Sequence, residues 1–196
     1  MFLTKIKFKG VVSFLFKINK KNDGIEMKKN CQKEITPKPN ESHMLRAIAL
    51  GRKGALIEKS GGPFGCVIVD KNGEVIAEGY NQVIKNNDPT WHAEMHAIRD
   101  ACQKVRSPHL TGCVLYTSAE CCPMCLAAAY WARISHIFYA SHMTDAYHYG
   151  KFQDLEIVTE LVKEPQTREI PSYEFKRQEA VEVWKEFSSM PNRTHY

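Results

Sequence analysis

The sequence contains no hydrophobic run long enough to cross a membrane. A membrane-spanning helix needs about 20 consecutive apolar residues, whereas the apolar stretch at residues 10–16 is followed at once by Lys17. That stretch is also at the lower limit for a secretory signal, and no cleavage site of small residues follows it. We therefore expect a cytoplasmic protein that makes no contact with a membrane.

The sequence also lacks the cysteine pattern of a small disulfide-stapled scaffold, because its seven cysteines are an odd number in a chain of 196 residues. Internal repeats and low-complexity segments are absent as well. Hydrophobic residues make up 43% and charged residues 25% of the chain, which is close to the averages of soluble globular proteins. Fibrous and disordered classes are thereby excluded, and a reducing compartment with a metal site is favoured.

Net positive charge is missing from most of the chain, although the formal total is +5. Residues 1–38 carry ten lysines against three acidic residues, and the remaining residues carry 17 basic and 19 acidic side chains, a charge of −2. A basic surface is the usual signature of nucleic-acid binding, so we expect no nucleic-acid partner. We predict a flexible basic arm at residues 1–38 and one domain at residues 39–196.

The hydrophobic pattern predicts an α/β fold. The expected elements are a helix capped by Asn40 or Ser42, a hairpin with strands at residues 66–69 and 75–77, a helix at 91–105, a strand at 113–116, a helix at 124–132 and a strand at 137–140. Candidate helices at 155–161 and 180–187 and an ambiguous extended segment at 170–175 follow. This order predicts a mixed sheet covered by helices.

Two short motifs, each at a predicted helix start, carry the chemistry. His92-Ala93-Glu94 opens one helix, and Cys122-Pro123-Met124-Cys125 opens the next. Residues three apart face the same side of a helix, so Cys122 and Cys125 can hold one metal ion, and the helix dipole favours their thiolate forms. If parallel strands bring both helix starts to one sheet edge, His92 joins them, and this donor set selects zinc.

Three protein ligands leave a fourth position open to water, which distinguishes a catalytic zinc from a structural zinc. Glu94 can then move protons without binding the metal. Each motif alone says little, because a lone Cys-x-x-Cys is equally a redox or structural zinc motif. Together they match the signature of zinc-dependent deaminases, His-x-Glu followed by Pro-Cys-x-x-Cys.

Residues from about His43 to the end resemble the bacterial guanine deaminases of the cytidine-deaminase-like superfamily. The resemblance covers about four fifths of the chain and rests on the stretches at residues 61–65, 77–81, 87–90, 115–118, 122–126, 130–133 and 144–146, with the closing Tyr196. It implies a three-layer αβα fold whose mixed central sheet has about five strands.

The resemblance also implies that guanine is hydrolysed to xanthine and ammonia, in purine breakdown or salvage. One zinc ion per chain, with its water, would be held by His92, Cys122 and Cys125. Glu94 would relay a proton from the attacking water to the base, and Asp145 would be a second proton carrier and a contact for guanine. Asn81 would hydrogen-bond the base, and Phe64 would pack on its face.

The C-terminal segment, from about residue 165 to 196, crosses to the partner subunit in this family. A homodimer with C-terminal exchange is therefore implied, in which Tyr196 caps the site of the other chain. A frayed terminus remains the alternative for Tyr196, and a helix cap the alternative for Asp145.

Two residues depart from the pattern. Cys121 stands where the signature has proline, and we expect it to bind no metal. Trp91 stands where a small residue usually precedes the histidine, so it either reshapes the pocket or fills a neighbouring gap. Other nucleobase or nucleoside deaminases, a tRNA adenosine deaminase and a non-catalytic zinc module stay open as alternatives, although Glu94 and an open metal position disfavour the last.

Overall fold

The computed structural model describes residues 37–194, so most of the predicted basic arm and Tyr196 lie outside the described residues. The first helix, α2, spans Glu41–Arg52 and continues as one π-helical turn at Lys53–Ile57. Asn40 caps it, since its side-chain oxygen accepts the backbone N–H of Ser42 at 2.9 Å. The sequence left Asn40 and Ser42 open as caps, and the structure selects Asn40.

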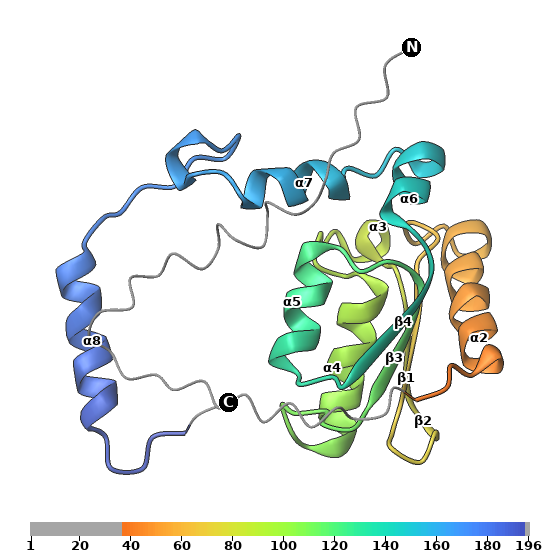
Figure 1. The fold of residues 1–196 in the computed structure, drawn as a ribbon, viewed down its shortest axis with the longest axis horizontal. Coiled ribbons are helices and arrows are strands. Elements are labelled where there is room, and N and C mark those ends of the chain that lie inside the picture. Colours follow the sequence, from red (N-terminus) through yellow and green to blue (C-terminus); the bar gives the residue numbers. More distant parts are fainter. Residues whose placement is uncertain (1–36, 195–196) are drawn as a thin grey trace. The chain divides into compact units, whose positions relative to one another are not determined.

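A four-stranded sheet forms the centre of the fold (Figure 1). Its strands are β1 (Gly65–Val69), β2 (Val75–Tyr80), β3 (Val114–Ala119) and β4 (His136–Ser141), in the spatial order β2-β1-β3-β4. β1 is antiparallel to both β2 and β3, whereas β3 and β4 are parallel. The predicted mixed sheet and hairpin are confirmed, with four described strands in place of about five.

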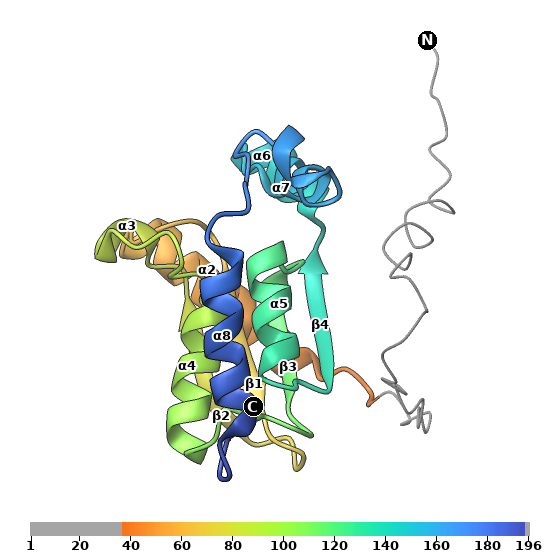
Figure 2. The ribbon, with the colours of Figure 1, turned by 90° about the vertical axis from the view of Figure 1, so that its left-hand side faces the viewer.

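Helices cover both faces of this sheet, as the three-layer prediction requires. α2 packs on one face, and α4 (Ala93–Val105) and α5 (Pro123–Trp131) lie side by side on the other (Figures 1 and 2). Alternate residues of the fully buried strand β1 feed the two cores: Cys66 and Ile68 face α4 and α5, and Val67 and Val69 face α2. Burial on both faces explains why β1 is apolar throughout.

Close backbone packing at the sheet edge depends on glycine. A Cβ atom on Gly65 would lie 2.1 Å from the carbonyl oxygen of Ala47, and one on Gly51 would lie 2.6 Å from that of Pro63. Although glycine weakens a helix, Gly51 is needed in α2, because its missing side chain lets the turn at residues 61–65 approach the helix. That turn supplies one wall of the cavity described below.

The remaining elements lie outside the two cores. They are α3 (Val83–Asn86), α6 (Met143–Gly150), α7 (Asp154–Leu161), a 3₁₀ turn at Pro165–Thr167 and α8 (Arg177–Ser189). None of these helices has a buried residue. The extended segment expected at residues 170–175 is exposed and belongs to no sheet of the described chain. No described helix combines the length and apolarity needed to span a bilayer.

Candidate active site

Three side chains with metal-binding atoms meet where α4 and α5 begin. His92 is the N-cap residue of α4, Cys122 is that of α5, and Cys125 lies in the first turn of α5. Their ligand atoms all lie within 4.8 Å of one another, and Nδ1 of His92 is 3.5 Å from the sulfur of each cysteine. The convergence expected from the two motifs is therefore present.

The spacing of these atoms fits a zinc ion. With Zn–N and Zn–S bonds of about 2.0 and 2.3 Å and tetrahedral angles, a nitrogen and a sulfur ligand stand roughly 3.6 Å apart, which matches the 3.5 Å found here. Two sulfurs and an imidazole are also the donor set that zinc prefers. Cys121 is buried but not part of the cluster among the described residues.

Hydrogen bonds favour the thiolate form of Cys122. The bond with the Cys125 thiol and then the bond with His92 lower the pKa of Cys122 to about 4, against the effect of burial. The same contact with Cys122 raises the pKa of His92. A negatively charged sulfur at a helix N-terminus is prepared to receive a cation.

Glu94 lies beside the cluster without belonging to it. It occupies the first turn of α4, is only 4% exposed, and accepts a hydrogen bond of 3.0 Å from the hydroxyl of Thr117 on β3. Burial raises the pKa of its carboxyl group. A buried carboxyl group that is not tied to a basic side chain can take up and release a proton, which is the role predicted for it.

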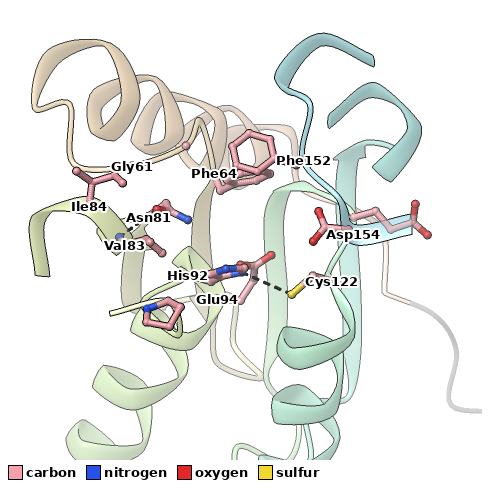
Figure 3. A pocket seen from close by; sticks show the side chains of 13 residues that line it. Gly61, Phe64, Asn81, Val83, Ile84, His92, Glu94, Cys122, Phe152 and Asp154 are labelled. Atoms are coloured by element: carbon pink, nitrogen blue, oxygen red, sulfur yellow. Dashed lines mark hydrogen bonds between the residues drawn. The ribbon is translucent and has the colours of Figure 1, made fainter. Parts of the chain in front are cut away.

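The cluster opens into a cavity of about 500 Å³ (Figure 3). Its walls are formed by Gly61, Gly62, Phe64, Asn81, Val83, Ile84, Pro89, His92, Glu94, Glu120, Cys122, Phe152 and Asp154. Of the residues predicted for the substrate, Phe64 and Asn81 line this cavity. A volume of this size suits a small ring molecule.

Asn81 is fixed so that its amide group can donate. Its side-chain oxygen accepts the backbone N–H of Val83 at 3.2 Å, and the residue is 3% exposed. Gly61 makes room for it, because a Cβ atom there would lie 1.9 Å from the same oxygen. The oxygen is thus engaged, and the NH₂ end is left for a carbonyl acceptor in the cavity.

Asp145 does not reach the cavity. Its carboxylate accepts the backbone N–H of His142 at 2.9 Å and so caps α6, which is the alternative that the sequence left open. It lines a second, smaller cavity of about 220 Å³. Asp154, at the start of α7, lines the main cavity instead.

Sequence reasoning missed Asp154, together with Glu120, Phe152 and Thr117. Asp154 is half-buried, and its pKa is raised by burial and then by the charge of Cys122. An aspartate just before a predicted helix at residues 155–161 is typical of a cap, so its position gave no sign of a role in the cavity. Thr117 extends a strand that the sequence predicted to end at residue 116.

Trp91 does not line the cavity. Its ring packs against His96 at 5.9 Å, and the guanidinium group of Arg99 lies 5.4 Å from it. Of the two possibilities for this residue, the structure supports the filling of a neighbouring space.

The fold and the histidine-cysteine cluster define a zinc-dependent deaminase of the cytidine deaminase type. Residues 37–141 match the cytidine and deoxycytidylate deaminase zinc-binding region, and the chain belongs to this family.

Guanine deaminases and tRNA-specific adenosine deaminases are among the similar proteins. Guanine deaminase from Bacillus subtilis (strain 168) is 44% identical over 157 residues, which are 80% of this chain and 99% of that protein. The X-ray structure of guanine deaminase from Bacillus subtilis is similar with a TM-score of 0.76 at 42% identity, covering 81% of this chain and 99% of that one. The tRNA-specific adenosine deaminase from Aquifex aeolicus is 39% identical over 94 residues, 48% of this chain and 62% of that protein.

Proposed function

We propose that this chain hydrolyses guanine to xanthine and ammonia. The main support is the buried carboxyl group of Glu94, which lies beside the histidine-cysteine cluster. Glu94, His92 and Cys122 line a cavity whose volume suits a nucleobase. The similarity to guanine deaminase over almost the whole length of that protein supports the same substrate. We further propose a cytoplasmic role in purine breakdown, with one zinc ion per chain held by His92, Cys122 and Cys125.

His92, Cys122 and Cys125 would hold the zinc ion, which would polarise a water molecule and lower its pKa to about 7. Glu94 takes one proton from the attacking water and gives it to the ring nitrogen next to C2, where it stays, and then moves the remaining proton of the new C2 hydroxyl group to the leaving amine. The C2–N bond breaks as the C2–O bond becomes a carbonyl, so water and guanine give xanthine and ammonia. The hydrogen bond from Thr117 holds the carboxyl group in place for both transfers.

The other cavity residues orient the base. The Asn81 amide donates to its carbonyl oxygen, and Phe64 packs on its face. Asp154 is the second carboxyl group near the metal ligands and takes the proton-carrying role that the sequence assigned to Asp145. A capping role for Tyr196, which lies outside the described residues, remains a proposal.

A polyanionic substrate is disfavoured by the walls of the cavity. Glu94, Glu120 and Asp154 place three carboxyl groups around it, and residues 39–196 carry a net charge of −2. A tRNA substrate would bring phosphates close to this acidic surface, whereas nucleic-acid sites are basic. A neutral free base would not be repelled by this acidic surface.

The test is a panel of guanine, guanosine, cytosine, adenine and a tRNA anticodon stem-loop, measured as released ammonia. We expect release from guanine alone among these. Glu94→Gln abolishes it while zinc content by mass spectrometry stays at one per chain, and Glu74→Gln in the hairpin turn serves as the matched control with full activity. Release from cytosine or tRNA with guanine inert would overturn the assignment.

We also propose a homodimer in which residues 165–196 of each chain pack on the other. The support is the exposure of large apolar side chains in this segment: Ile170, Tyr173, Phe175, Val183 and Trp184 are all more than 60% exposed. Soluble proteins bury such a group of side chains against a partner. Light scattering should give twice the chain mass, and a Trp184→Ser/Phe175→Ser variant should be monomeric and inactive. If the wild-type protein is active as a monomer, the proposed C-terminal exchange is wrong.

The division of the chain at residue 38 has its own test. A protein that begins at Met27 lacks six of the ten arm lysines and should keep full activity and zinc content. Loss of the dimer in light scattering would show instead that the arm belongs to the assembly.

A further inference from the structure

Asp154 lies near the metal ligands on a segment that has little packing of its own. Of the described residues after Cys122, only Phe152 and Asp154 line the main cavity. Both belong to the segment of α6 and α7, neither of which has a buried residue. Apolar burial in the helices themselves therefore does little to fix the segment, and a local attachment must place Asp154.

Phe152 makes that attachment. Its ring meets the ring of Phe64 edge to face, with centroids 4.8 Å apart and an interplanar angle of 77°. Edge-to-face aromatic pairs are stabilised beyond the burial of their apolar area. Figure 3 shows the two rings next to each other at the top of the cavity, with Asp154 on the side of Cys122.

Two glycines form the rest of the slot for this ring. A Cβ atom on Gly62 would lie 2.7 Å from Cζ of Phe152, and one on Gly150 would lie 2.6 Å from its Cδ2. Neither position has room for a side chain while the ring is in place. The slot joins the turn at residues 61–65 to the end of α6, two segments far apart in the sequence.

The backbone turns sharply to bring the ring into this slot. α6 ends at Gly150, and its C-cap residue Lys151 has a left-handed conformation with φ of 57°. The N–H of Lys151 donates to the carbonyl of Tyr147 at 3.1 Å. Phe152 then donates to the carbonyl of Ala146 at 3.4 Å. Because α7 begins two residues later at Asp154, the position of the ring determines where that carboxyl group lies.

The same ring separates two cavities. Phe64 and Phe152 line both the main cavity and the smaller cavity of about 220 Å³ that Asp145 lines. Removal of the Phe152 ring would join these spaces, and water could then enter beside Asp154. The pair is thus a wall as well as an attachment.

We propose that Phe152 is a positioning residue for the reaction: it anchors the α6–α7 segment in the slot of Gly62, Phe64 and Gly150, and thereby holds Asp154 over the metal-ligand cluster. The expected effect on kcat rests on the proposed function. The expected order of the α6–α7 segment does not depend on which substrate the protein uses.

The kinetic test is a double-mutant cycle with guanine as substrate. Phe152→Ala should lower kcat roughly 10²-fold, the cost of a misplacement of about 1 Å, and so should Asp154→Asn. The double variant should be no slower than Asp154→Asn alone, because Phe152 acts through Asp154. Phe152→Leu, which refills most of the slot, should recover much of the loss. Two independent losses that multiply in the double variant would overturn the proposal.

A matched control separates this role from a general loss of packing. Phe138 is a half-buried phenylalanine on β4, and its ring packs on Tyr116 at 5.2 Å, away from the slot. Phe138→Ala should reduce the free energy of unfolding. In the double variant with Asp154→Asn, the two reductions of kcat should multiply, as expected for independent effects. Equal coupling of both phenylalanines to Asp154 would show that the coupling is not specific to the slot.

Amide hydrogen exchange of the zinc-loaded protein tests the anchor without any substrate. Phe152→Ala should speed exchange at residues 143–161 by at least tenfold while zinc content stays unchanged, and Asp154→Asn should leave that segment protected. If exchange there does not respond to Phe152→Ala or Phe152→Leu, the anchor is refuted. If wild-type protein leaves guanine intact but the exchange changes as expected, the proposed function fails and the anchor stands.

Discussion

At the scale of single residues, the chemistry depends on how two carboxyl groups are surrounded. Glu94 is buried and tied to a neutral hydroxyl group, whereas Asp154 is half-buried on the same cavity as Cys122. The sequence predicted Glu94 and the three candidate metal ligands because their spacing within each motif is fixed by helix geometry. Their partners come from elsewhere in the chain, and Thr117 lies 23 residues from Glu94.

The hydrogen bond from Thr117 predicts a specific kinetic defect. Thr117→Val keeps the shape of the side chain but removes the donor, so that the buried carboxyl group loses one of its hydrogen bonds at a cost of roughly 1–3 kcal/mol. Because Glu94 acts in the chemical step, kcat for guanine should fall roughly tenfold or more while KM changes little. Thr117→Ser retains the hydroxyl group and is the control. A changed KM with normal kcat would contradict this role.

Trp91 predicts a difference between two substitutions. Its indole nitrogen is buried without a hydrogen-bond partner among the described residues, so the side chain serves for its ring contacts with His96 and Arg99. Trp91→Phe should therefore leave the free energy of unfolding close to that of the wild type. Trp91→Ala should lower it by about 2 kcal/mol, near half the cost at a fully buried site. Urea denaturation measures both, and equal losses would show that the ring contacts contribute little.

At the scale of elements, the predictions were most accurate where a strand or helix faces the core. The hairpin, α4, α5 and β4 were predicted within a few residues, because their apolar periodicity reflects burial. β3 runs on to Ala119 because its polar residues are paired: Ser118 accepts the N–H of Gly65, and Thr117 contacts Glu94. α3 and α6 were missed because α3 has only four residues and α6 contains no leucine, isoleucine or valine, whereas α7 and α8 do and were predicted although they too bury no residue.

An ion pair that joins α2 to β2 predicts a dependence of stability on pH. Arg46 donates twice to Glu78 at 2.7 Å, and this hydrogen bonding lowers the pKa of Glu78. The contribution of a lowered carboxyl pKa is present above the unfolded-state pKa and is lost as the pH falls through the folded-state value. Because both side chains are partly exposed, the pair contributes about 0.5–1 kcal/mol.

Arg46→Gln should therefore lower the free energy of unfolding in urea at about pH 7. The difference from the wild type should shrink as the pH falls below about 4.3, the usual pKa of glutamate, and vanish once Glu78 is protonated in the folded protein. Lys176→Gln, which breaks the exposed pair with Glu179 on α8, is the control without a measurable effect. A difference between Arg46→Gln and the wild type that persists in acid would assign the effect to packing of the arginine stem.

At the scale of the whole molecule, the candidate metal site lies at one end of a core that extends well beyond it. The apolar side chains of β1 and β3 are buried between α2 on one side and α4 and α5 on the other, and Cys122 and Cys125 belong to the second of these two clusters. Zinc would cross-link the starts of α4 and α5 at one edge of this core. A sheet that is buried on both faces should persist without that link.

Removal of zinc by a chelator should therefore abolish activity without unfolding the chain. A metal present at about 100 times its Kd contributes about 2.7 kcal/mol, so Tm should fall by roughly 5–10 °C while the far-ultraviolet circular dichroism at room temperature is kept. Added Zn²⁺ should restore both Tm and activity. Since the thiols and the imidazole must lose protons to bind the metal, affinity for zinc should fall as the pH is lowered. Loss of the circular dichroism signal on chelation would show that the metal, and not the two-sided core, holds the fold together.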